Sequence, residues 1–124
     1  MKLFTVKEAN ELLPALIPRL ERIQSLYGKL STLREGARVA AAASEFGGGM
    51  EGGTFYVKTL YEIGKLTTGL HEDGIQLKDY NRGLIDFPSM RDDRIVLLCW
   101  QLGETPSIQW WHEVDGGFAG RQPL

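Results

Sequence analysis

The chain has 124 residues, of which 43% are hydrophobic and 24% are charged, and its formal net charge is −2. These values are ordinary for one globular domain, and they exclude a wholly disordered or fibrous chain. A net charge this small supplies no field that would attract nucleic acid or anionic lipid, so we expect neither as a partner. Composition therefore indicates a globular fold and leaves the function open.

The chain contains a single cysteine, Cys99. It cannot form a disulfide within the chain, and a zinc or iron–sulfur site built from several thiolates of one chain is excluded as well. Charged residues near the start interrupt any secretory apolar segment. The most apolar run of small residues, 39–43, is far shorter than the roughly 20 residues that span a membrane. We therefore expect a soluble cytoplasmic protein with no membrane partner.

The type of acidic residue changes near residue 73. Eight of the ten glutamates precede this position, whereas all six aspartates lie from Asp73 onward. Glutamate suits helix interiors, and aspartate suits caps and turns. We therefore predict one domain, 1–124, with a helical part at 1–73 and a small β-rich part at 74–124.

The first predicted helix begins at a capping box, Thr5-Val6-Lys7-Glu8. Apolar residues then recur every three or four positions, at Val6, Ala9, Leu13, Leu16, Leu20, Ile23, Tyr27 and Leu30. This spacing predicts a helix that continues through the alanine run at 40–43 and is bent but not broken at Pro14 and Pro18.

A second apolar series follows a glycine-rich connection at 47–53. Its members are Tyr56, Leu60, Ile63, Thr67 and Leu70. Thr54 is the predicted N-cap of this helix and Gly74 its predicted stop. The two helices predict an antiparallel hairpin. At 1.5 Å per residue the first helix spans roughly 58 Å and the second roughly 27 Å, so the first third of the long helix needs another cover.

The C-terminal part has the patterns of short strands. The predicted strands are 74–79, 84–87 before Pro88, 95–100 and 108–114. Turn residues separate them, and the glycine-rich tail at 116–120 predicts no regular element. The expected fold class is α+β, with a long antiparallel helical hairpin and a small antiparallel sheet packed on the N-terminal part of the first helix.

Several short motifs resemble one family over nearly the whole chain. They are Phe4-Thr5-Val6, Glu8-Ala9-Asn10, Leu12-Leu13-Pro14, Leu77-Lys78-Asp79, Arg82-Gly83-Leu84-Ile85-Asp86-Phe87-Pro88, Leu98-Cys99-Trp100, Leu102-Gly103-Glu104, Trp111-His112-Glu113 and Gly117-Phe118-Ala119-Gly120-Arg121. Together they resemble the bacterial family called domain of unknown function 2203. The resemblance implies a small cytoplasmic bacterial protein, and it carries no established activity, so no catalytic residue is transferred.

Polar residues of the β-rich part are the candidate ligand-binding residues. They are Asp79, Arg82, Asp86, His112, Glu113 and Arg121. His112 with Asp86 could hold a divalent metal, or a carboxylate could tune His112 as a general base. His112 and Glu113 are adjacent, so a regular strand directs them to opposite faces. We favour a structural role in which His112, facing inward with Trp110, bonds to the backbone or to Asp86.

The two arginines among these candidates lie beside glycines. Arg82 and Arg121 could grip a carboxylate or phosphate. We favour internal pairing instead, of Arg121 with Asp86 or Glu113, because acidic residues outnumber basic ones after residue 72.

Three further features of the sequence are explained by structural roles and need no functional site. His71 lies near the end of the second helix, where a cation favours the helix dipole. Cys99 lies in an apolar strand, which suits a buried, unreactive thiol rather than a nucleophile. Trp110 and Trp111 point to opposite faces, so one of them needs a second cover, for which the tail through Phe118 is the plainest source.

The function we favour is a non-enzymatic binding or assembly module. The long apolar series, widened by Leu12, Leu26 and Leu33, could pair with another copy of the chain in a homo-oligomer. The alternative is a metal- or small-ligand-binding protein, including a hydrolase-type enzyme, that uses the polar residues of the β-rich part. No cofactor is evident beyond a divalent metal.

Overall fold

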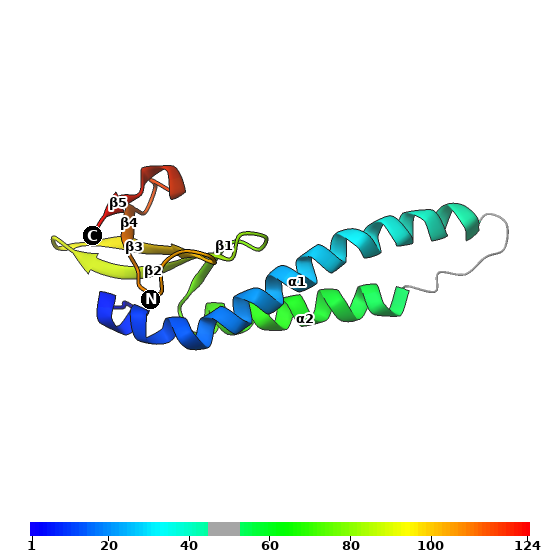
Figure 1. Cartoon of the computed structure of the whole chain (residues 1–124), viewed down its shortest axis with the longest axis horizontal. Coiled ribbons are helices and arrows are strands. Elements are labelled where there is room, and N and C mark those ends of the chain that lie inside the picture. The colour runs from blue at the N-terminus through cyan, green and yellow to red at the C-terminus, as the bar shows by residue number, and fades with distance from the viewer. Residues whose placement is uncertain (45–52) are drawn as a thin grey trace.

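The computed structural model describes residues 1–44 and 53–124, and most of the predicted glycine connection lies outside the described residues. Two helices, α1 (Val6–Ser44) and α2 (Gly53–Glu72), precede the strands β1 (Gln76–Asp79), β2 (Leu84–Arg91), β3 (Arg94–Gln101) and β4 (Trp110–Glu113). A 3₁₀ turn, η1 (Phe118–Gly120), and a short strand, β5 (Gln122–Pro123), complete the chain. Figure 1 shows the hairpin extending to one side of a sheet that lies at the N-terminal end of α1. The predicted α+β class is confirmed.

Both predicted ends of the helical part are made by local hydrogen bonds. The Thr5 backbone N–H donates to Glu8 Oε1 at 2.9 Å, and the Glu8 N–H donates to Thr5 Oγ1 at 3.1 Å, which completes the capping box. At the end of α2, Gly74 has a φ of 85° and its N–H donates to the His71 carbonyl. The Ile75 N–H donates to the Leu70 carbonyl at 3.0 Å. This pair of bonds is a Schellman motif, for which glycine is the favoured residue.

The long helix is continuous through both prolines. Pro14 and Pro18 lie inside α1, and Figure 1 shows the helix changing direction after its first turns. Most of the predicted apolar series is buried, but Leu26 takes the place predicted for Tyr27. Tyr27 instead stacks on Tyr80, with ring centroids 5.5 Å apart.

The buried series of α2 differs from the predicted one. Thr59 is buried, whereas Leu60 is exposed. The Thr59 hydroxyl donates to the Phe55 carbonyl at 2.7 Å, which satisfies it in this position. Both series fit the helical repeat, so the choice depends on how α2 packs against α1. Thr54, the predicted N-cap, lies within α2, which begins at Gly53.

The sheet has the order β1-β2-β3-β4-β5, and every neighbouring pair is antiparallel. The predicted end of the second strand at Pro88 is wrong, because β2 continues to Arg91. Pairing with β1 ends at Asp86. The Pro88 carbonyl accepts from the Phe4 N–H at 2.8 Å. The missing N–H of Pro88 therefore faces the same unpaired edge and costs no ladder bond.

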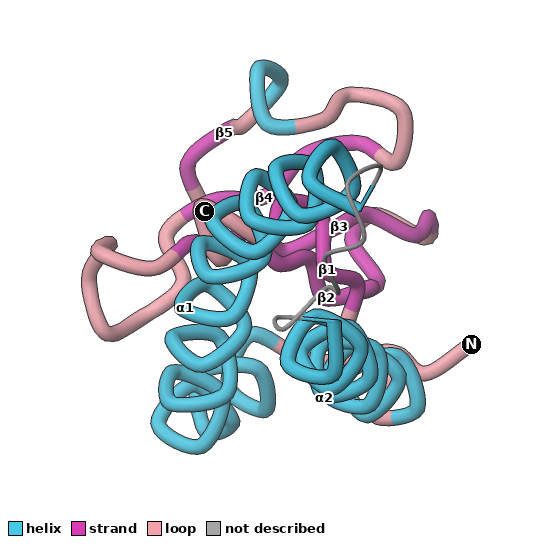
Figure 2. The backbone as a smooth tube through the Cα atoms, turned by 90° about the vertical axis from the view of Figure 1, so that its right-hand side faces the viewer, coloured by secondary structure: helices cyan, strands magenta, loops and turns pink. Residues whose placement is uncertain are grey.

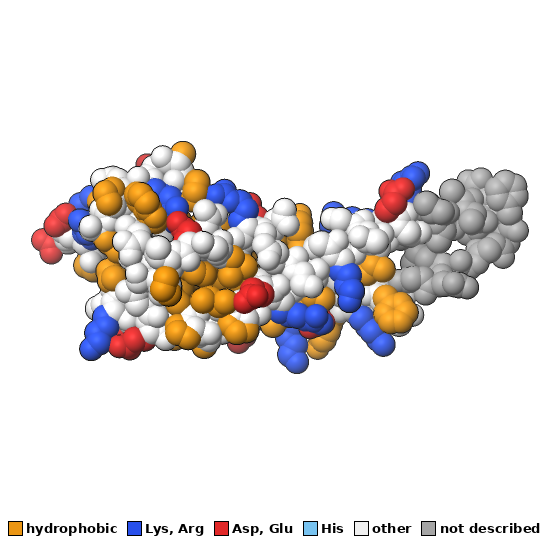
Figure 3. Space-filling model, in the orientation of Figure 1, with side chains coloured by type: hydrophobic (Ala, Val, Ile, Leu, Met, Phe, Trp, Pro, Cys, Tyr) orange, Lys and Arg blue, Asp and Glu red, His pale blue; other side chains and the backbone are white. Residues whose placement is uncertain are grey.

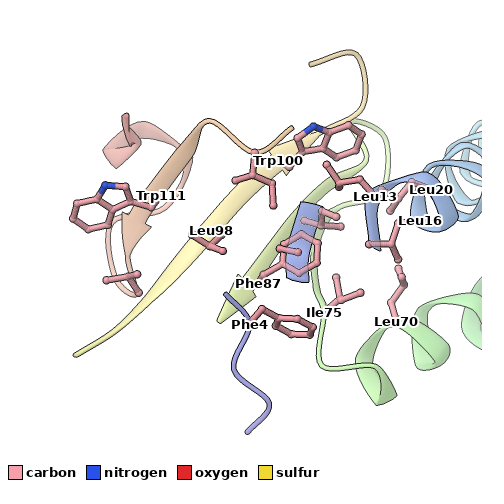
Figure 4. Packing of buried hydrophobic residues seen from close by; sticks show 14 of the residues in the cluster. Phe4, Leu13, Leu16, Leu20, Leu70, Ile75, Phe87, Leu98, Trp100 and Trp111 are labelled. Atoms are coloured by element: carbon pink, nitrogen blue, oxygen red, sulfur yellow. The ribbon is translucent and has the colours of Figure 1, made fainter. Parts of the chain in front are cut away.

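One face of the sheet packs on the first third of α1, as predicted. Leu13, Leu16 and Leu20 form a hydrophobic cluster with Phe87 and Trp100 (Figure 4). The side chain of Asn10 adds a polar link, because its Oδ1 accepts from the Ile108 N–H at 2.7 Å. A smaller cluster of Leu26, Leu30 and Ile63 lies farther along the hairpin.

The opposite face of the sheet carries the C-terminal tail, as Figures 1 and 2 show. Contrary to the prediction for 116–120, this tail contains a 3₁₀ turn, η1, and the short strand β5 follows it. Trp111 belongs to the hydrophobic cluster on the helix side. Trp110 lies on the tail side, where the Arg121 guanidinium lies 5.3 Å from its ring centroid. The tail therefore supplies the second cover that the two tryptophans require. No helix of the described residues is long and apolar enough to cross a membrane.

Candidate functional site

Three adjacent strands bring three potential ligand residues together on the tail side of the sheet. Asp86 of β2 is the register partner of Cys99 of β3, and His112 follows Trp110, the partner of Cys99 on β4, by two residues. One potential ligand atom from each of Asp86, Cys99 and His112 lies within 4.8 Å of the others, and all three residues are buried. In the described part of the chain no other such group of three occurs. We call these residues the buried cluster.

His112 makes both of the hydrogen bonds expected for a structural role. Its Nδ1 lies 2.7 Å from the Glu113 carbonyl oxygen, and its Nε2 lies 3.1 Å from Asp86 Oδ2. The second oxygen of this carboxylate, Oδ1, is buried and has no hydrogen-bond partner among the described residues. The inward orientation predicted for His112 is observed, on the face of the sheet that is turned away from the helices.

The Cys99 thiol is held in its protonated form. Its pKa is raised to about 12, mainly by burial and next by the charge of Asp86. A thiolate nucleophile needs a lowered pKa and access to substrate. The structure therefore favours the predicted unreactive thiol.

Two of the other predicted site residues, Asp79 and Glu113, use their carboxylates apart from the buried cluster. Asp79 Oδ1 accepts from the N–H groups of Asn81 and Arg82, both at 2.9 Å, and so caps its own turn. Glu113 forms an ion pair with Arg94. The Asp79 contacts lie within one turn and the Glu113 contact joins β4 to β3, so both carboxylates are engaged away from His112.

Arg82 and Arg121 fasten the tail. Arg82 donates to Gln101 Oε1 at 3.1 Å, and its guanidinium lies 4.1 Å from the Phe118 ring centroid. Arg121 pairs internally as predicted, but its partner is Glu104, with bonds of 2.9 and 2.6 Å. Arg121 Nη2 also lies 3.3 Å from the Cys99 carbonyl oxygen.

Sequence reasoning considered Cys99 only as a nucleophile and missed its place beside Asp86 and His112. Its position in the middle of the most apolar strand indicates burial. The register that places it opposite Asp86 depends on the hairpin turn, where Asp92 and Asp93 have φ values of 50° and 62°. Such turns favour Asn-Gly or Asp-Gly, so Asp-Asp is a weak signal for this register.

A second candidate site lies on the surface of α2. Val57 and Tyr61 are 63% and 72% exposed, and Gly64 and Thr68 continue the same side of the helix. We call these four residues the outer face of α2. It borders an open groove of about 740 Å³ lined in part by Arg19, Lys58, Lys65 and Leu66. Figure 3 shows hydrophobic and basic side chains together along this part of the molecule.

Comparison with protein families gives one match, which covers residues 2–124 and carries the description "Uncharacterized conserved protein (DUF2203)". The chain belongs to this family. The description of DUF2203 names no activity, so it assigns no role to the buried cluster or to the outer face of α2. Neither curated proteins nor solved structures give a match to the chain.

Proposed function

We propose that the protein is a non-enzymatic assembly module that works as a homodimer joined through the outer face of α2. The observation that carries this proposal is the pair of large apolar side chains, Val57 and Tyr61, presented to solvent one helical turn apart. Exposed apolar groups that gather on one face favour association with a partner. Most of the apolar series of α1 that we expected to mediate assembly is already buried within the chain, whereas Val57 and Tyr61 of α2 are exposed.

A second copy of the chain suits this face because α2 is complementary to itself when reversed. Its first half carries the bulky residues, Val57 and Tyr61, and its second half carries the small ones, Gly64 and Thr68. An antiparallel twofold arrangement sets each bulky half against the small half of the other copy.

We place this module in the bacterial cytoplasm. The family resemblance implies a bacterial protein, and a single free cysteine suits a reducing compartment. The raised pKa of Cys99 and the ion pair of Glu113 with Arg94 do not favour the hydrolase-type alternative.

The matched pair Val57→Glu and Val114→Glu tests the proposal. The two valines are 63% and 62% exposed, but Val114 lies beyond β4 and far from α2 in the sequence. Sedimentation equilibrium is expected to give a dimer for the unchanged chain and for Val114→Glu, and a monomer for Val57→Glu. Circular dichroism confirms that both variants are folded. A monomeric unchanged chain, or a Val57→Glu variant that dimerises as well as the control, contradicts the proposal.

A further inference from the structure

We propose that the buried cluster of Asp86, Cys99 and His112 binds one transition-metal ion of the zinc type. This proposal does not depend on the assembly proposed above, because the two sites share no residue. It extends the sequence-based hypothesis of a metal held by His112 and Asp86 to a third ligand, Cys99.

Each ring nitrogen of His112 has one polar neighbour within hydrogen-bond distance. A backbone carbonyl only accepts, so Nδ1, 2.7 Å from the Glu113 carbonyl oxygen, carries a hydrogen. In the neutral ring Nε2 then has a lone pair, and this lone pair faces Asp86 Oδ2 at 3.1 Å. An ionised carboxylate also presents lone pairs. Two acceptors this close, both buried, require a positive group between them, which is either an additional proton or a metal ion.

The surroundings favour the metal ion over the additional proton. A proton shared by Asp86 and His112 leaves Asp86 Oδ1 buried without a partner. The Cys99 sulfur lies within 4.8 Å of the other ligand atoms, where its thiol is close enough to Asp86 for a side-chain hydrogen bond in the absence of a metal and supplies a third ligand in its presence. A metal ion engages the imidazole, the carboxylate and the sulfur together. A backbone carbonyl that holds the far ring nitrogen is the usual arrangement for a metal-binding histidine.

The three donor types identify the class of metal. A thiolate and an imidazole suit zinc and neighbouring transition metals, whereas magnesium and calcium require oxygen ligands. Zinc bonds of 2.0–2.3 Å hold tetrahedral ligand atoms about 3.5 Å apart, so modest side-chain rotations bring the buried cluster to this spacing. The second oxygen of Asp86 or a water completes the coordination.

Charge balance permits a divalent ion in this buried position. Coordination breaks the Cys99 S–H bond, forms a sulfur–metal bond and releases the proton to solvent. The resulting thiolate and the Asp86 carboxylate together neutralise a 2+ ion, and His112 stays neutral. The nearby Arg121 guanidinium does not add net charge, because Glu104 pairs with it.

The test uses the full chain after removal of metal with a chelator, and Co²⁺ alone is the first probe. Coordination by Cys99 is expected to give a thiolate-to-cobalt charge-transfer absorption that saturates at one ion per chain and is displaced by Zn²⁺. Because the tail covers the site, Co²⁺ is added both to the folded chain and during refolding from urea. Slow access is then not mistaken for absence of binding.

Two variants and one control locate the site. Cys99→Ala is expected to abolish the charge-transfer absorption, and both Cys99→Ala and His112→Ala to weaken binding by at least about 10-fold. His71→Ala removes the other histidine of the chain, which is exposed at the end of α2, and is expected to bind as the unchanged chain does. If His112→Ala does not fold, the Co²⁺ affinity of Cys99→Ala still tests the proposed site.

Two results overturn the proposal. One is the absence of stoichiometric binding after both methods of addition. The other is a Cys99→Ala variant that binds as tightly as the unchanged chain. Either result identifies the buried cluster as an internal hydrogen-bonded pair beside a thiol, and leaves the dimer measured with Val57→Glu unaffected.

Discussion

Single residues at the start of α1 connect the helix to the sheet. Thr5 caps the helix, and Phe4, immediately before it, is buried with its ring centroid 5.3 Å from that of Phe87. The Phe4 N–H also donates to the Pro88 carbonyl on the unpaired edge of β2. The cap therefore directs Phe4 into the core, so a loss at Thr5 affects both the helix and its contact with the sheet.

Replacement of the capping residue Thr5 tests how much the cap contributes to stability. Thr5→Ala removes the side-chain oxygen that accepts from the Glu8 N–H, and is expected to lower the free energy of unfolding by about 1 kcal/mol. Urea denaturation measures the change. Thr5→Ser keeps the oxygen and serves as the control. Equal losses in the two variants would mean that the Thr5 methyl group, and not the hydrogen bond, is responsible.

The partner of this cap adds a dependence on pH. The pKa of Glu8 lies below its ordinary value of 4.5, chiefly because the Thr5 backbone N–H donates to the carboxylate. A carboxyl with a lowered folded-state pKa contributes stability above pH 4.5 and loses it as the pH falls through the folded-state pKa. The stability difference between the unchanged chain and Glu8→Gln is therefore expected to shrink in acid. A difference that is independent of pH would contradict this assignment.

Turns between elements show where glycine is required. Gly83, before β2, and Gly103, after β3, have φ values of 59° and 92°. A Cβ on Gly83 would lie 2.5 Å from Leu102 Cδ1, whereas a Cβ on Gly103 meets nothing within 4 Å. Both positions share the backbone strain of a side chain at positive φ. Only Gly83 adds a steric conflict with a residue that packs against the main core.

The matched substitutions Gly83→Ala and Gly103→Ala separate these effects. Gly103→Ala is expected to cost about 1–2 kcal/mol through backbone strain alone. Gly83→Ala is expected to cost about 1–3 kcal/mol more, because Leu102 must move. Chemical denaturation of both variants measures the difference. Equal costs would show that Leu102 adapts without penalty.

Elements with strong local signals could be predicted from the sequence, and those set by tertiary packing could not. The capping box at Thr5 and the stop at Gly74 are made by residues within a few positions, so their patterns suffice. The continuation of β2 beyond Pro88 depends on Phe4, which is distant in sequence. The burial of Thr59 in place of Leu60 depends on how α2 packs on α1.

The sequence predicted one part of the candidate site, the contact of His112 with Asp86, but not the position of Cys99. The pairing of His112 with Asp86 was among the expected contacts because both are polar residues of predicted strands. The addition of Cys99 required the register of two hairpins, in which Asp86 meets Cys99 and Cys99 meets Trp110. A shift of one residue would turn Cys99 to the helix side of the sheet, so the strand patterns alone could not place it.

The described residues form two hydrophobic clusters of different size. The larger one joins α1, α2 and the sheet, and the smaller one, Leu26, Leu30 and Ile63, joins only the two helices. Figure 1 shows that the sheet lies at the other end of the molecule from the far part of the hairpin, which is at the right of the picture. Segments with little buried apolar surface open at lower free energy than the core. We therefore expect the far part of the hairpin to open while the sheet and the first third of α1 stay folded.

The same substitution in each cluster tests this expectation. Leu16 and Leu30 are 2% and 4% exposed, so Leu→Ala removes a comparable buried side chain from each. Leu16→Ala is expected to lower the global free energy of unfolding by about 2–5 kcal/mol and to speed hydrogen exchange in both helices and the sheet. Leu30→Ala is expected to speed exchange in the far part of the hairpin and to leave the slowest amides of β2 and β3 nearly unchanged, because those amides exchange only when the larger cluster opens. If Leu30→Ala speeds exchange in β2 and β3 as much as in the hairpin, the chain unfolds as one unit and the small cluster has no independent opening.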